Sequence, residues 1–209
     1  MSPTPTLHCY PGDGGSLGAL LLADYLGAEL STRFLKPINI TERIYKKSAT
    51  KTFPMLDLGA DKMIERTPAI LRYLARVHPS PALYEGLGDH AVLVDEHLDS
   101  FYYIFAPSFA LQAAHFNKLV QLSGDQAKAV FKKVQEGLSY VEKACEKTPQ
   151  LEANIFDFYF IAVLHALSHN PEVKSRLKGC KAIKQRYEKL GADEKFAKVA
   201  APYLSIFKR

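Results

Sequence analysis

Residues 154–168 are nearly all apolar. A helix on the surface needs polar side chains on the side that faces water, so a helix that is apolar on every side has to be buried. Other elements must then surround it. We therefore expect the 154–168 segment to be the central helix of a larger helical assembly.

Asn154 and Asp157 stand at the start of this apolar segment. An Asn at a helix N-cap, followed three residues later by an acid that can reach back to the cap N–H, is a capping-box arrangement. A carboxylate in so apolar a stretch must be buried, with its hydrogen bonds satisfied. We therefore interpret Asn154 and Asp157 as structural residues.

The segments on either side of it also predict helices. Residues 89–105 carry their apolar side chains on one side, and residues 125–147 repeat them at three- and four-residue spacing. Two shorter helices are expected in the basic C-terminal segment. Residues 80–88 contain Pro and Gly at turn-like spacing and predict a linker before this helical part.

The first 79 residues alternate strand-like and helix-like patterns. Ser16 can lie near the N-cap of the first helix, and Gly27 can close it. Thr67 can cap the last helix of this part, with Pro68 at the first helical position. The expected order is strand 6–10, helix 16–27, strand 31–35, loop 37–52, a hairpin of strands 53–58 and 62–65, and helix 67–78.

Three cysteines, Cys9, Cys145 and Cys180, are scattered and odd in number. This argues against a disulfide framework and for a reducing compartment. The first residues show no secretory signal, and the apolar run from Leu17 to Ala23 is far shorter than the roughly 20 residues that cross a bilayer. We expect a cytoplasmic protein that has no membrane partner.

The positive charge of the chain lies at its C-terminal end. The chain carries a net charge of +5, and residues 172–209 hold eleven Lys and Arg against four acids, a net +7, which leaves −2 for residues 1–171. Lys174, Lys178 and Lys181 are spaced to share one helix face and are candidate polyanion contacts. The other interpretation is a helix face that is simply solvated.

No residue set in the sequence predicts a metal site. His8 and Cys9 are adjacent, so in a strand they point to opposite faces. His165 and His169 have i, i+4 spacing without an acid between them, which favours a core or interface histidine. Asp13-Gly14-Gly15-Ser16 lacks the G-K-[ST] of a phosphate loop and predicts a turn before a helix.

Phe53-Pro54 and Thr67 are the better binding candidates. A Pro that opens a strand can hold a cis bond, which would leave the backbone of Phe53 free to pair with an extended ligand. A hydroxyl and free N–H groups at a helix N-terminus, as at Thr67, favour a carboxylate. For Thr67 alone, plain capping is the favoured interpretation.

Three segments stand in a fixed order: Phe53-Pro54-Met55-Leu56, Arg66-Thr67-Pro68-Ala69-Ile70-Leu71-Arg72-Tyr73-Leu74 and Asn154-Ile155-Phe156-Asp157. Together they resemble the cytosolic glutathione transferases over nearly the whole chain. The resemblance implies an α/β thioredoxin-like domain over 1–79, a linker over 80–88 and an all-α domain over 89–209. It also implies a glutathione-binding site, with glutathione as ligand or cosubstrate and no other cofactor. Its residues would be Phe53, Pro54, Arg66 and Thr67.

In that family a Tyr ending the first strand, or a Ser or Cys starting the first helix, lowers the pKa of the glutathione thiol. Aligned without gaps, Cys9 falls at the Tyr position and Asp13 at the Ser or Cys position. A carboxylate there would raise the thiol pKa. Tyr10 lies one residue away, on the opposite face of the strand, and Ser16 lies one turn into the helix. If the chain is an enzyme, the catalytic candidates are Tyr10, Ser16 and Cys9.

The family's acid before the γ-glutamyl-binding Ser is replaced by Arg66, with Glu65 one place early. The first helix and its lead-in, residues 10–28, resemble instead the transferase-like domains of the elongation factor 1 gamma subunit and of aminoacyl-tRNA synthetases. This resemblance implies a protein–protein interaction domain of the translation machinery with little or no transferase activity. Its partners would be a second transferase-like domain or itself, synthetases or elongation factor subunits, with tRNA nearby.

Two other functions stay open. One is an active glutathione transferase of atypical class that conjugates glutathione to electrophiles. The other is an RNA-binding module, which would bind tRNA in a salt-sensitive way through Lys174, Lys178 and Lys181.

Overall fold

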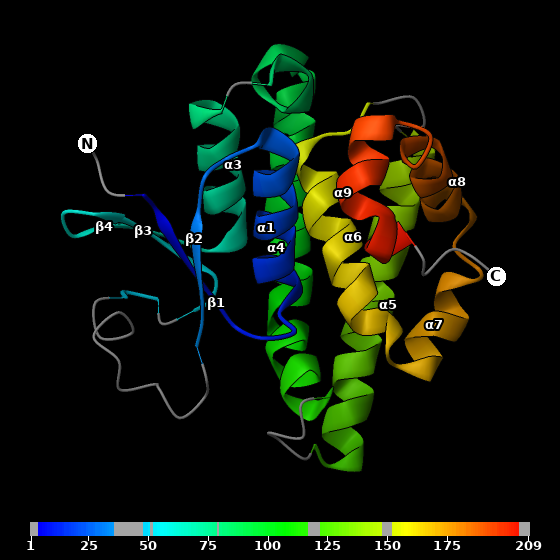
Figure 1. Cartoon of the computed structure of the whole chain (residues 1–209). Coiled ribbons are helices and arrows are strands. Elements are labelled where there is room, and N and C mark those ends of the chain that lie inside the picture. The colour runs from blue at the N-terminus through cyan, green and yellow to red at the C-terminus, as the bar shows by residue number, and fades with distance from the viewer. Residues whose placement is uncertain are drawn as a thin grey trace.

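A four-stranded sheet forms the N-terminal part of the molecule (Figure 1). The computed structural model describes residues 4–35, 48–50, 52–78, 80–116, 122–147 and 152–204. The strands are β1 (Thr6–Cys9), β2 (Ser31–Phe34), β3 (Met55–Gly59) and β4 (Lys62–Glu65), in the spatial order β2-β1-β3-β4. β1 pairs parallel with β2 and antiparallel with β3, and β3 pairs antiparallel with β4. The predicted order of the strands along the chain and the predicted hairpin are confirmed.

Helix α1 (Gly14–Leu26) makes the crossover between the parallel strands β1 and β2. Gly27 ends it in the left-handed conformation, φ 67°, which a glycine adopts without steric cost. The N-cap is Asp13, and Ser16, which was expected near the N-cap, is the third residue of the helix. The helix starts earlier than expected because the Asp13 carboxylate accepts the first free N–H groups.

Helix α3 (Thr67–Val77) follows β4 directly. Arg66 occupies the N-cap with φ 73°, and its side chain makes no capping hydrogen bond. The expected N-cap, Thr67, is therefore the first helical residue. The one-residue difference arises because the chain reverses at Arg66, where the positive φ redirects the backbone from the strand into the helix.

The rest of the described chain is helical. Its longest helices are α4 (His90–Phe116) and α5 (Gly124–Lys147), and the buried one is α6 (Ile155–Ser168). α4 continues through Pro107, so its expected end at Phe105 is wrong. The basic segment contains three short helices and not two: α7 (Pro171–Leu177), α8 (Lys181–Leu190) and α9 (Glu194–Leu204).

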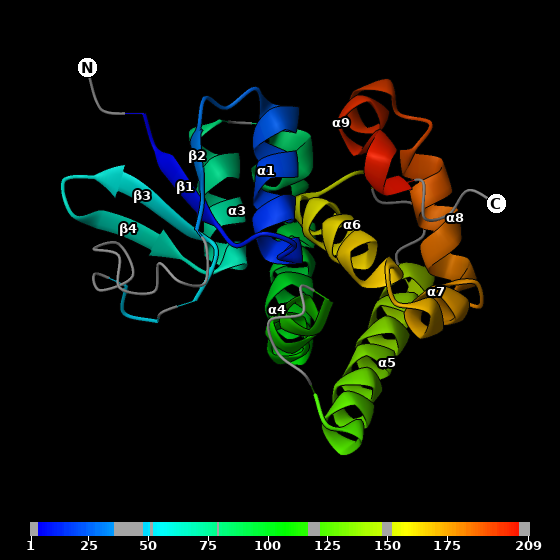
Figure 2. The ribbon, with the colours of Figure 1, turned by 60° about the horizontal axis from the view of Figure 1, so that its bottom comes forward.

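Between α3 and α4 the predicted linker, residues 80–88, holds short 3₁₀ turns over Pro81–Leu83 and Glu85–Leu87. The domain boundaries themselves stay a prediction. Within the described ranges, the structure has no helix long and apolar enough to cross a membrane. The strands lie on one side of the molecule and the later helices on the other, with α1 and α3 between them (Figures 1 and 2).

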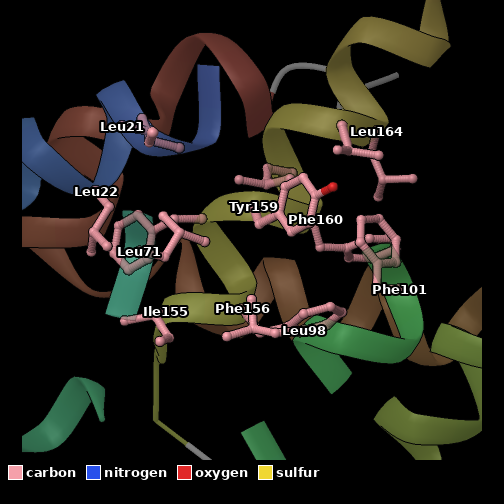
Figure 3. Close-up of a cluster of buried hydrophobic side chains, with 14 of the residues drawn as sticks. Leu21, Leu22, Leu71, Leu98, Phe101, Ile155, Phe156, Tyr159, Phe160 and Leu164 are labelled. Atoms are coloured by element: carbon pink, nitrogen blue, oxygen red, sulfur yellow. The ribbon is translucent and has the colours of Figure 1, made fainter. Parts of the chain in front are cut away.

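α6 is the centre of the helical part, as predicted. Most of its residues are buried, and aromatic rings from α4 pack edge-on against it: the ring centroid of Phe101 lies 5.4 Å from Phe156, 4.9 Å from Tyr159 and 5.2 Å from Phe160. Leu21 and Leu22 of α1, Leu71 of α3 and Leu98 of α4 belong to the same cluster (Figure 3). One core therefore joins the α/β part to the helical part.

Glycines let α1 approach the backbone of α6. A Cβ added at Gly14 would come within 2.8 Å of Val163 Cα, and one at Gly18 within 2.9 Å of Tyr159 Cα. Both distances are shorter than real Cβ contacts. The beginning of α1 is thus held directly against the central helix.

Asn154 and Asp157 form the capping box at the start of α6. Asn154 accepts from Phe156 N at 3.0 Å, and Asp157 accepts from Asn154 N at 2.9 Å. The Asp157 carboxylate also binds Arg186 of α8, with Nε 2.6 Å from Oδ1 and a terminal nitrogen 2.5 Å from Oδ2. Sequence reasoning missed this buried ion pair because Arg186 lies far away along the chain.

Candidate functional site

The start of α1 carries the residues that sequence analysis singled out for thiol chemistry. We call Cys9, Tyr10, Asp13 and Ser16 the Asp13 cluster. Asp13 N donates to Tyr10 O at 3.1 Å, which closes a tight turn between β1 and α1. This turn brings the four residues together at the junction of sheet and helix.

Asp13 accepts hydrogen bonds from the chain's own donors at the helix start. Ser16 N and Ser16 Oγ each lie 2.7 Å from Asp13 Oδ2, and Gly15 N lies 3.3 Å from Oδ1. Burial raises the pKa of this carboxyl group, while the bonds from Ser16 and Gly15 oppose the rise. The groups that would stabilise an anion at this helix N-terminus are therefore already bound to a carboxylate.

Cys9 is fully buried, and its thiol contacts the carbonyl oxygen of Leu7 at 3.8 Å. Burial, with a smaller effect of the Asp13 charge, raises the pKa of the Cys9 thiol to about 12, although a hydrogen bond to Ser16 opposes the rise. Only the thiolate is a good nucleophile. Cys9 is protonated at neutral pH and does not fit a thiol-transfer role.

Ser16 and Tyr10 fit thiol activation poorly as well. Ser16 is 1% exposed; its hydroxyl donates to Asp13 and accepts from Tyr10 N at 3.3 Å. Tyr10 is partly exposed, its ring lies 6.2 Å from that of Phe53, and burial raises its pKa. Of the cluster, Tyr10 and Asp13 are partly exposed, whereas Cys9 and Ser16 are buried.

The expected glutathione-binding residues lie at the turn into β3 and at the start of α3. The Phe53–Pro54 peptide bond is cis. Arg66 is exposed, whereas Thr67 is 1% exposed and hydrogen-bonded to Tyr159 of α6. Gly15 packs so closely on the Thr67 hydroxyl that no side chain fits between them. The Thr67 hydroxyl is thus engaged inside the molecule.

Tyr159 is a residue that sequence analysis missed. It is 2% exposed, and its pKa is raised well above the usual value by burial, by the Asp13 charge and by Tyr102 of α4. A buried Tyr hydroxyl needs a partner, and most of the other residues of α6 are apolar. That isolated hydroxyl was the available signal for a polar contact between the central helix and the Asp13 cluster.

Glu65 is also engaged within the chain. Its carboxylate accepts from Ala49 N and Thr50 N at 2.8 Å each, and from the Thr50 hydroxyl. Burial alone would raise the pKa of Glu65. The hydrogen bonds from Thr50, Ala49 and Ser48 outweigh this effect and lower the pKa. Glu65 holds the 48–50 segment, so the exposed side chain beside Thr67 is the cationic Arg66.

The three candidate polyanion contacts do not share one helix. Lys174 lies in α7, Lys178 caps its C-terminal end, and Lys181 begins α8. The expected single face is wrong because the chain turns between them: Gly179 N bonds to Arg176 O at 2.9 Å, and Cys180 N to Leu177 O at 3.1 Å. Their contact with a polyanion stays a prediction.

A groove of about 920 Å³ runs between α5 and the turn from α7 to α8, away from the Asp13 cluster. Its walls carry both signs of charge: Lys132, Glu136, Glu142, Lys143, Glu146 and Arg176. Glu142 is occupied, because it accepts from Ala182 N at 2.8 Å and Ile183 N at 3.0 Å at the start of α8. The acids of this groove all come from α5, so the surface beside the turn from α7 to α8 carries both signs of charge.

No cluster of three or more His, Cys, Asp or Glu side chains in the described ranges could hold a metal ion. His165 and His169 do lie together, with ring centroids 5.5 Å apart. His8 is buried in β1.

No family model matches the chain, and a search of curated proteins finds no match. Solved structures do match over almost the whole length. A glutathione S-transferase-like protein from Lodderomyces elongisporus superposes with a TM-score of 0.78 at 17% identity, covering 95% of this chain and 96% of that one. The glutathione transferase URE2P6 from Phanerochaete chrysosporium, solved with oxidised glutathione, gives 0.77 at 16% identity over 97% of both chains.

A delta-class glutathione transferase from Nilaparvata lugens gives a TM-score of 0.70 at 20% identity over 98% of both chains. At these identities the likeness establishes the fold. The chain therefore has the glutathione transferase fold, with a four-stranded mixed sheet followed by a mostly helical part. The predicted fold class is confirmed.

Proposed function

We propose that this chain is a protein–protein interaction domain built on the glutathione transferase fold, with little or no transferase activity. One observation carries the proposal: the Asp13 carboxylate occupies the N-terminus of α1. It accepts both backbone N–H groups and the Ser16 hydroxyl that a thiolate would need there.

The electrostatic consequence has a definite sign. A thiolate beside a carboxylate experiences repulsion between like charges, which raises the thiol pKa. Transferase chemistry needs the opposite shift, because the thiolate is the nucleophile. Tyr10 could still donate a hydrogen bond to a thiolate, and this single observation favours the alternative, a transferase of atypical class.

The proposed setting is the translation machinery of the cytoplasm, with a second transferase-like domain, a synthetase or an elongation factor subunit as partner. Support comes from the resemblance of residues 10–28 to transferase-like domains of such proteins. α4 also exposes three large side chains, Val92 at 69%, Leu93 at 37% and Tyr103 at 79%. Exposed apolar side chains that gather on one helix suit a protein contact.

The catalytic part of the proposal is tested by turnover of glutathione with a chlorodinitrobenzene-type electrophile. We expect no rate above the uncatalysed reaction. The matched variant is Asp13→Ser, which keeps a capping oxygen but removes the negative charge. It is assayed beside the wild-type chain. Wild-type turnover that is lost in Tyr10→Phe or Ser16→Ala would establish the alternative.

The partner is tested separately by sedimentation of the purified chain with purified transferase-like domains of synthetases and elongation factor subunits. We expect a complex that Val92→Asp with Tyr103→Asp weakens. Phe34→Asp, which changes an exposed residue on β2, is the control and should leave the complex intact. Absence of any complex would overturn the assignment to translation and leave the catalytic test unaffected.

A further inference from the structure

Helix α9 packs against both α6 and α1 (Figures 1 and 2). Its buried Phe196 lies with its ring centroid 5.2 Å from that of Phe158, and Lys195 Nζ stands 4.1 Å from the centre of the Tyr25 ring. Near the other end of α9, Tyr203 packs on His165 of α6, with ring centroids 5.0 Å apart. His165 therefore lies at the contact that holds the end of α9 in place.

His165 has a polar atom that the structure leaves unsatisfied. Its Nδ1 is buried and has no hydrogen-bond partner among the residues that the structure describes. In the neutral ring with the proton on Nε2, Nδ1 is an unpaired acceptor. Protonation turns Nδ1 into a buried N–H donor that also lacks a partner, and adds a positive charge. An unsatisfied buried donor disfavours the closed state.

The surroundings of His165 do not compensate that charge. Burial lowers the pKa of His165, and His169 on the same helix lowers it further. Tyr203 faces it from α9, and the pKa of Tyr203 is itself raised by burial and by Asp24 of α1. His169 is the charged group that acts on His165 within the described part of the chain.

Of the other helices that pack on α6, α1 brings Asp24 close enough to Tyr203 to raise its pKa, and the titratable groups of the rest are placed as follows. α4 brings His97 next to Phe156, at the opposite end of α6. α3 has Arg72 paired with Asp95 of α4. α7 carries exposed charges at Glu172, Lys174 and Arg176, and α9 carries exposed charges at Glu194, Lys195 and Lys198.

We propose that protonation of His165 releases helix α9 from α6, so that the C-terminal helix of the described chain is an acid-sensitive element. Because protonation is easier in the opened state than in the closed one, docking of α9 is strongest above about pH 6.5, the usual imidazole pKa. It weakens as pH falls toward the lowered pKa of the closed state, by at most about tenfold in the opening constant per pH unit.

Hydrogen–deuterium exchange of the α9 amides tests this inference. After correction for the intrinsic rate, we expect opening of residues 194–204 to increase several-fold, up to about tenfold, between about pH 7.5 and about pH 5.5. The α5 amides serve as internal control and should keep their protection. His165→Phe retains a ring against Tyr203 and should abolish the pH dependence.

His169→Gln is the second variant. It removes a neighbour that lowers the pKa of His165 in the closed state, so the gap to the opened-state pKa narrows and the acid-induced increase in opening should become smaller. Equal α9 protection at both pH values, or an unchanged dependence in His165→Phe, would overturn the inference. An NMR titration of His165 decides the matter even if the Phe variant fails to fold: a pKa below about 6.5 supports it, and a pKa at or above that value refutes it.

Discussion

Asp13 affects the free energy of folding in two opposite ways. As N-cap of α1 it stabilises the helix, with Ser16 N at 2.7 Å, and as a buried carboxylate its ionised form is disfavoured. Asn caps a helix about as well as Asp and carries no charge. The two roles can therefore be separated by substitution.

Asp13→Ala should lower the free energy of unfolding by about 1 kcal/mol, the usual cost of losing an N-cap. Asp13→Asn should keep the cap. Since the folded pKa of Asp13 is raised above its ordinary 3.8, its favourable contribution is present below that value and is lost as pH rises through the raised pKa. The Asn variant should therefore gain relative to wild type from about pH 4 to about pH 7, measured by denaturant unfolding. A relative loss over this range would contradict the raised pKa.

Among the ion pairs of the described residues, Asp157 and Arg186 form the most buried one. Their side chains are 0% and 9% exposed. Arg186→Leu leaves the Asp157 charge without its partner in the core. We expect a loss of about 3–5 kcal/mol of unfolding free energy. Arg72→Leu is the matched control, because Arg72 and Asp95 are 21% and 38% exposed, and should cost about 1 kcal/mol or less. Equal losses would show that burial does not set the cost.

These residue-level contacts mark the limit of sequence reasoning. The spacing of Asn154 and Asp157 was enough to predict the capping box, because both partners lie within one turn. The partners of Asp157, Thr67 and Glu65 could not be predicted, since Arg186, Tyr159 and Thr50 reach them only through the tertiary fold.

At the scale of elements, the contact of α1 with α6 depends on the absence of side chains. A Cβ at Gly18 would lie 2.9 Å from Tyr159 Cα and 3.1 Å from Phe158 O, both backbone atoms that cannot move aside easily. The same contact places Asp13 and Thr67 next to Tyr159. Packing of the two helices and the geometry of the Asp13 cluster are therefore linked.

Gly18→Ala should destabilise the protein despite the better helix propensity of Ala. Overpacking costs about 1–3 kcal/mol, against roughly 1 kcal/mol gained from propensity. Gly124, the first residue of α5, is the control, because a Cβ there meets nothing within 4 Å. Thermal unfolding should show a lower midpoint for Gly18→Ala and no loss for Gly124→Ala. A stabilised Gly18→Ala variant would contradict the close packing.

The order of the elements followed from the sequence, whereas several of their ends did not. Apolar side chains at three- and four-residue spacing identified α5, and a nearly continuous apolar segment identified α6. The apolar spacing predicted an end at Phe105 that α4 passes through, and regular lysine spacing suggested one helix where Gly179 and Cys180 form a turn. Local sequence patterns of this kind do not decide the conformation where the surrounding packing favours another one.

Across the whole molecule, α1 joins the sheet to the central helix, and its N-terminus lies at that junction (Figure 2). The fold alone does not decide function, because one fold can serve both as an enzyme and as a binding module. What separates the two here is the charge at the start of α1. Asp13 places a carboxylate where thiol activation requires a donor or a positive potential.

The pKa of the glutathione thiol in the presence of the protein tests this most directly. It is measured from the ultraviolet absorbance of the thiolate during a pH titration, with Asp13→Ser titrated in parallel. The account predicts a thiol pKa at or above that of a free cysteine, about 8.5, and a lower value in the Ser variant if glutathione binds. A wild-type thiol pKa clearly below the value for free glutathione would contradict it.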